Sequence, residues 1–270
     1  MRKVFVRRSD AGDPEAPMAA LYRSGRNGAV AVKLYLALLW RCSAPPFDTD
    51  KPARAWATLL DLDDPENAGA RRIKNAMKTL REAGLIEVLE NPGYPNLVRL
   101  LDESGNREPY TLPSTAYTKA KQTGAKPGVL ARQMYFKIPP QLWTDGYIQE
   151  LNGPGLAMLL ILLAEQGGEG EAVWFSTTEF PQRYSISHKT RAAGTRELVN
   201  ARLLTVDSES IAVKMSRAAT TFDPRRRRKI YRLAPPAQST VTEVEGVTQL
   251  RKARRRKRKK DAGQSTATVS

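Results

Sequence analysis

One series of predicted elements occurs twice in the chain, and this repeat limits the folds open to it. The first copy predicts helices over residues 29–40, 52–60 and 70–83, followed by two β-like runs. The second copy predicts helices over residues 155–165, 177–184 and 187–201, also followed by β-like runs. The third helices align without gaps at an offset of 118, which sets Leu80 opposite Leu198 and Leu85 opposite Leu203. The sequence therefore predicts two units of the same design.

The segments outside the repeat set the domain boundaries. Residues 104–133 are rich in Gly, Pro, Ser, Thr and Lys and show no clear periodicity, so they are interpreted as a linker. Residues 235–270 are polar and end in a basic run, which is typical of a disordered tail. The predicted fold is α+β and mostly helical, with domains at 1–103 and 134–234.

Three helices followed by a hairpin resemble the winged helix-turn-helix family. The resemblance covers residues 28–102 and 153–233, and it is carried by ATLLDL in the second helix and RRIKNAMKTLREAGLI in the third. The tandem arrangement also resembles that of plasmid and mobile-element replication initiators of actinobacterial type. The resemblance implies that the third helix of each unit enters the DNA major groove and that the hairpin is a wing.

The positive charge is concentrated in two patches. The formal net charge is +16, but residues 251–260 hold nine basic residues and residues 225–229 hold five, so the rest of the chain is nearly neutral. Patches of this kind attract a polyanion. We therefore expect double-stranded DNA as the partner, and no membrane.

Composition argues against several enzyme classes and against cofactors. A single cysteine and a single histidine exclude a disulfide framework and a two-histidine metal centre within one chain. The sequence has no phosphate-binding P-loop motif, and its longest apolar run, 155–164, is half the ~20 residues of a membrane span. We expect a cytoplasmic, nucleoid-associated protein that is not an enzyme. The cluster Asp61, Asp63, Asp64 and Glu66 leaves a metal-dependent nuclease as a distant alternative.

The third helix of the first unit has the pattern of a recognition helix. Ile73, Met77 and Leu80 form one apolar arc, and polar residues occupy the opposite side. Asn can pair bidentately with adenine, and Arg or Lys with guanine. The candidate DNA-binding residues here are Arg71, Arg72, Lys74, Asn75 and Lys78.

The third helix of the second unit fits this pattern less well. The candidate DNA-binding residues are His188, Lys189, Thr190 and Arg196. The same register sets Arg191 at the core position of Ile73, and Ala192, Ala193 and Gly194 give the helix a small contact face. Either the register slips by one residue or this helix approaches the DNA backbone closely without reading many bases. His188 is either a phosphate contact or a polar neighbour of the helix cap.

Basic residues also lie in the second hairpin and in the tail. The runs 211–215 and 229–233 are the predicted strands of this hairpin, with the wing between them. Arginines on a wing can enter a narrow minor groove or contact flanking phosphates. The candidates are Arg225, Arg226, Arg227, Arg228, Lys229, Arg254, Arg255 and Arg256.

These expectations favour sequence-specific DNA binding for the initiation of plasmid or mobile-element replication. The chain would have no nuclease or ATPase activity of its own and would recruit host replication proteins. A transcriptional regulator of the same fold is the first alternative, and a nucleic-acid-coating protein bound through its tail is the second. The uncharged tip of the first hairpin, 92–95, leaves a homodimer open.

Overall fold

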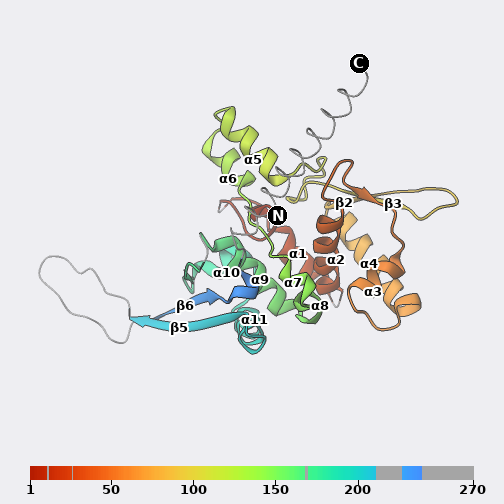
Figure 1. Ribbon diagram of the computed structural model, residues 1–270. Coiled ribbons are helices and arrows are strands. Elements are labelled where there is room, and N and C mark those ends of the chain that lie inside the picture. The colour runs from red at the N-terminus through yellow and green to blue at the C-terminus, as the bar shows by residue number, and fades with distance from the viewer. Residues whose placement is uncertain (11, 26, 168–169, 211–226, 239–270) are drawn as a thin grey trace, which may run out of the picture.

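A computed structural model describes residues 1–10, 12–25, 27–167, 170–210 and 227–238, and it is an α+β structure (Figure 1). The helices are α1 (Pro17–Arg23), α2 (Gly28–Arg41), α3 (Ala53–Leu59), α4 (Ala70–Glu82), α5 (Pro113–Gln122), α6 (Pro127–Gln133), α7 (Gln141–Thr144), α8 (Tyr147–Glu150), α9 (Gly153–Glu165), α10 (Glu179–Tyr184) and α11 (His188–Asn200). The strands are β1 (Asp48–Thr49), β2 (Ile86–Leu89), β3 (Leu97–Leu100), β4 (Val173–Trp174), β5 (Leu204–Ser210) and β6 (Arg227–Leu233).

The predicted repeat is present in the structure. Both units run helix, strand, helix, helix, strand, strand, and both antiparallel sheets have the last strand in the middle, in the orders β1-β3-β2 and β4-β6-β5. Helices α4 and α11 begin and end at positions that differ by 118. Strand β1 was not predicted, because its two residues lie in a stretch that has the composition of a turn.

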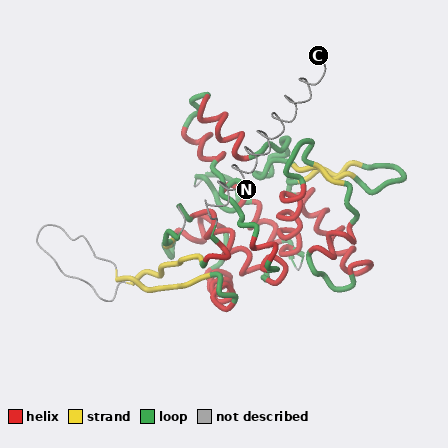
Figure 2. Tube along the Cα trace, in the orientation of Figure 1, coloured by secondary structure: helices red, strands yellow, loops and turns green. Residues whose placement is uncertain are grey.

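A shared core joins the two units. Helices α2 and α9 are apolar on nearly all sides, and their buried side chains belong to one continuous cluster that reaches both sheets. The two helices contact each other, and a Cβ added at Gly153 would lie 3.2 Å from the Tyr22 ring and 3.5 Å from the Ala29 Cβ. Figure 2 shows the two hairpins on opposite sides of this helical body.

Helix α11 packs tightly on α9. A Cβ added at Gly194 would lie 2.1 Å from the carbonyl oxygen of Pro154, so only glycine allows this approach. The Glu197 carboxylate accepts hydrogen bonds from the backbone N–H groups of Asn152 (2.6 Å) and Gly155 (3.0 Å), at the positive end of α9. Assigning Gly194 to an outward contact face was therefore wrong, because Gly194 is buried against α9.

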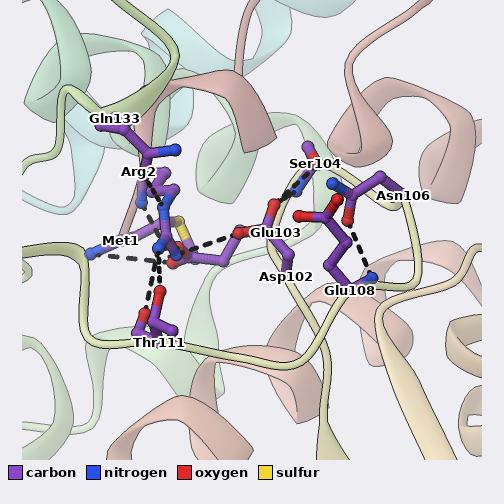
Figure 3. A network of polar contacts seen from close by, with 9 residues as sticks. All are labelled: Met1, Arg2, Asp102, Glu103, Ser104, Asn106, Glu108, Thr111 and Gln133. Carbon is purple, nitrogen blue, oxygen red and sulfur yellow. Dashed lines mark hydrogen bonds and ion pairs between the residues drawn. The ribbon is translucent and has the colours of Figure 1, made fainter. Parts of the chain in front are cut away.

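The segment expected to be a linker contains two helices, α5 and α6, which pack on each other. A buried polar network ties this segment to the N-terminal residues (Figure 3). The Arg2 guanidinium donates to Glu103 Oε2 at 2.6 Å, to Thr111 Oγ1 at 2.8 Å and to Gln133 Oε1 at 2.9 Å. Both members of the Arg2–Glu103 ion pair are buried. The interactions of this network are therefore shielded from water.

The N-terminal residues pair with a segment that follows α6. Arg2 forms an antiparallel bridge with Tyr135, and the Phe136 N–H donates to the carbonyl oxygen of Met1 at 2.9 Å. Residues Lys3–Phe5, which follow Arg2, form a short 3-10 helix. The beginning of the first unit is thus held by the beginning of the second.

Candidate nucleic-acid interface

A turn of π-helix, Pro65–Gly69, sets the start of α4. The Asp64 carboxylate caps this turn by accepting hydrogen bonds from the backbone N–H of Ala68 and the side chain of Asn67, both at 3.1 Å. The hydrogen bond from Ala68, followed by that from Asn67, lowers the pKa of Asp64. Asp64, which we considered as a metal ligand, therefore accepts local hydrogen bonds. In the described part of the chain, no group of three or more His, Cys, Asp or Glu side chains could hold a metal ion.

Helix α4 has one buried apolar side and one exposed polar side, as the sequence predicts. Ile73, Ala76 and Leu80 are buried toward α2 and α3, and Met77 is half-buried. The exposed residues include Arg71, Lys74, Asn75 and Lys78, while Arg72 is half-buried. Glu82, at 3.9 Å from Lys78, is the one carboxylate paired with a cation within α4. The outer side of α4 therefore carries a net positive charge.

A groove lies between α4 and the β2–β3 hairpin. It has a volume of about 490 Å³, and Met77, Val88, Pro95 and Val98 contribute to its apolar lining. Its cationic lining residues are Lys51, Lys74, Lys78 and Arg81. Lys51 and Arg81 were not among the DNA-binding residues predicted from the sequence. Arg81 follows Lys74 and Lys78 at helical spacing, so the periodicity could have identified it. Lys51 precedes α3 and has no such signal.

The tip of the first hairpin presents an aromatic side chain. Tyr94, between β2 and β3, is 75% exposed. It belongs to the uncharged tip on which the sequence left a dimer contact open. Nothing in the fold shows what that tip contacts, so the homodimer stays a prediction.

Arg191 packs within the second unit at the position of Ile73, so the register of the repeat does not slip. Its guanidinium carbon is 4.6 Å from the ring centre of Phe180, 5.2 Å from that of Phe175 and 5.5 Å from that of Tyr231. Its Nη2 donates to the Tyr231 hydroxyl at 2.9 Å. Cation–π contacts of this kind allow an arginine to replace the isoleucine of the first unit. Arg191 therefore joins α11 to strand β6.

The candidates on α11 differ in exposure. His188, Lys189 and Arg196 are exposed. Thr190 is half-buried, and its hydroxyl lies 2.9 Å from that of Ser187, the N-cap residue whose side chain also accepts from the Thr190 N–H at 3.1 Å. Thr190 is thus part of the helix cap.

The second hairpin has a different register from the predicted one. The partner of β6 is β5, Leu204–Ser210, and not the run 211–215, which lies outside the described residues. Strand β6 begins at Arg227 and not at Lys229, so placing Arg227 and Arg228 in the loop of a wing was wrong. The prediction failed because 211–215 (IAVKM) is the more apolar of the two adjacent runs, while 208–210 are polar. Arg225 and Arg226 also lie outside the described residues, as do Arg254, Arg255 and Arg256.

The cations of the β5–β6 ribbon fall on two faces, since side chains alternate along a strand. On one face, Arg228 lies 3.0 Å from Glu209, and Arg232 lies 2.6 Å from Asp207. Arg227 and Lys229 share the other face with Tyr231, whose hydroxyl is bonded to Arg191 of α11. Neither Arg227 nor Lys229 has a carboxylate within ion-pair distance among the described residues. The face on the side of α11 is therefore the one with uncompensated positive charge.

No protein-family model, curated protein or solved structure matched this chain. Among the described residues, no helix has both the length and the apolar character needed to span a bilayer. The geometry of the two units is therefore the basis on which a function is proposed.

Proposed function

We propose that the chain is a sequence-specific double-stranded DNA-binding protein built from two winged helix-turn-helix units. The observation that carries this proposal is the outer side of α4, where Arg71, Lys74, Asn75 and Lys78 are exposed beside the cation-lined groove of the hairpin. In each unit the third helix is followed directly by a hairpin, which is the order of a recognition helix and its wing.

In the first unit the helix reads bases and the groove holds the phosphate backbone. Asn75 is the exposed amide among the cations of α4, and its side chain can pair with an adenine edge in the major groove. The ammonium and guanidinium groups of Lys51, Lys74, Lys78 and Arg81 then contact phosphates and fix the position of the helix.

In the second unit, the β5–β6 ribbon contributes more to DNA binding than α11 does. Helix α11 offers His188 and Lys189 at its start and Arg196 further along, with Ala192 and Ala193 also exposed. Arg191 is held within the aromatic cluster, so it is not available to DNA in this conformation. We infer that this unit binds chiefly phosphates, through α11 and through the ribbon face of Arg227 and Lys229.

The biological role we propose is the initiation of plasmid or mobile-element replication in the cytoplasm. Two units held by one core favour long or repeated sites, because binding of one unit raises the effective concentration of the other. In this role the chain has no nuclease or ATPase activity of its own, and host replication proteins supply those steps. Regulation of transcription by the same fold remains the alternative. Whether the DNA sites that the chain selects are repeated or single distinguishes the two roles.

The two faces of the ribbon provide a test of this interface. Lys229→Ala is expected to weaken DNA binding about three- to tenfold and to reduce the slope of log affinity against log salt by about one, because it removes one phosphate contact. Arg228→Ala, the matched control on the opposite face, removes the same charge from a residue paired with Glu209 and is expected to change affinity less than twofold. Titration of a labelled duplex at several salt concentrations measures both. Equal losses for the two variants would contradict the assignment of the binding face.

A further inference from the structure

Three of the four tryptophans in the chain gather at one hollow, which shares no lining residue with the proposed DNA groove. The hollow has a volume of about 230 Å³ and is lined by Ala37, Trp40, Arg41, Trp56, Leu59, Trp143, Thr144 and Gln149. Its walls come from α2 and α3 of the first domain and from α7 and α8 of the second. It therefore lies where the two units meet.

Direct contacts join the walls of the hollow. Trp56 is 3% exposed, and its indole N–H donates to the carbonyl oxygen of Lys51 at 3.2 Å. Trp40 and Trp143 meet edge to face with 6.2 Å between ring centres. The Gln149 amide donates to the carbonyl oxygen of Leu59 at 3.3 Å, so α8 is fixed to α3. A ligand would enter this site without having to order these groups.

The apolar surface continues outside the hollow. Trp40 is 50% exposed and Leu59 is 45% exposed, which makes them two of the most exposed large apolar side chains among the described residues. Of the described residues that line the site, none is a lysine, an aspartate or a glutamate. Tryptophan and arginine are enriched at the centres of protein interfaces, whereas those charged residues are depleted there. The residue composition of the hollow thus differs from that of the exposed side of α4 and resembles the composition of a protein-binding site.

Size and charge indicate the occupant. Sites for whole small molecules have volumes of about 300–1,000 Å³, so this smaller hollow suits one anchoring side chain. Arg41, the one ionisable residue in the lining, is exposed and has no carboxylate within ion-pair distance among the described residues. We propose that this hollow binds a short acidic segment of a partner protein, with one aromatic or aliphatic side chain inserted between Trp40 and Leu59 and a carboxylate on Arg41.

A display library of random twelve-residue peptides, selected on the full chain, tests the proposal. We expect enriched peptides to combine an apolar anchor with flanking Asp or Glu. Their affinity for Trp40→Ala should fall at least about tenfold, and Arg41→Glu should weaken the same peptides. Because Trp40 is half exposed, Trp40→Ala should lower the melting temperature only slightly, through loss of its contact with Trp143. Trp174→Ala is the matched control, since Trp174 is 54% exposed and also lies beside an arginine, Arg228, but outside this hollow.

Three results would overturn the proposal. Enrichment of acidic peptides without an apolar anchor, with unchanged affinity for Trp40→Ala, would mean that the basic surface alone binds them. Absence of any enrichment over a counter-selection on Trp40→Ala would mean that the hollow is not a peptide site. Self-association of the chain that Trp40→Ala abolishes would make a second copy the occupant. Because α4 is unchanged in every variant, DNA binding measured in parallel distinguishes failure here from failure of the proposed function.

Discussion

Exchanging both Lys74 and Lys78 for glutamate is expected to weaken binding to the selected DNA site by about a hundredfold. Both side chains lie on the exposed side of α4 and both line the hairpin groove. Loss of two charge-assisted contacts to phosphates, at ~1.5 kcal/mol each, gives about 3 kcal/mol, and each 1.4 kcal/mol is tenfold. The salt slope should fall by about two. Fluorescence anisotropy with a labelled duplex at several salt concentrations measures both quantities.

The matched control for this double variant is Lys119→Glu with Lys121→Glu. These lysines are exposed on α5, and the exchange changes the net charge by the same amount. Helix α4 should stay folded in the test variant, because the new contact of residue 78 with Glu82 costs only ~0.5 kcal/mol. If both double variants lost affinity equally, net charge alone would explain binding and the interface on α4 would be wrong.

Replacing Glu103 by alanine is expected to lower the free energy of unfolding by about 3–5 kcal/mol. Glu103 is 0% exposed and Arg2 is 1% exposed, and the two are joined by a 2.6 Å hydrogen bond (Figure 3). The substitution leaves the Arg2 guanidinium buried without its main counter-ion, which costs more than the pair contributes. Asp102, at 3.4 Å from Arg2, compensates only in part because it is the more distant carboxylate. Guanidinium chloride unfolding followed by circular dichroism measures the change.

Two further variants distinguish the cost of leaving a buried charge unpaired from the cost of losing an exposed salt bridge. Glu66→Ala removes the exposed pair with Arg54, whose charged atoms are 3.7 Å apart, and should cost less than about 1 kcal/mol. The double change Arg2→Met with Glu103→Leu should recover much of the stability, because it removes both buried charges. A cost below about 1 kcal/mol for Glu103→Ala would show that the network contributes little to folding.

The repeat and the third helices could be predicted because their signals are local. The spacing of Ile73 and Leu80 fixes the buried side of α4, and Gly84, at φ +70°, ends the helix region where the sequence predicts it. The same register placed Arg191 in the core of the second unit, although no local pattern favours a buried arginine. The aromatic rings that surround it come from three separate elements, so their contribution was not visible in the sequence.

Contacts between residues far apart in the chain could not be predicted from the sequence. The Arg2–Glu103 ion pair spans 101 positions, and neither residue stands out from its neighbours in the chain. The pairing of β5 with β6 depends on which of two adjacent runs fits the sheet, and strand register is decided by tertiary packing. The tryptophan hollow likewise forms only when α7 and α8 pack beside α2 and α3.

The measurement that tests sequence-specific DNA binding most directly is selection from a random duplex library, with the full chain and its Asn75→Ala variant in parallel. The account predicts that the parent chain enriches one extended or repeated motif. It further predicts that Asn75→Ala loses about 1–3 kcal/mol on that motif, with its preference relaxed at one adenine, and loses little on random DNA. Equal recovery of all sequences by the parent chain, or an identical motif at identical affinity for Asn75→Ala, would contradict base reading by α4.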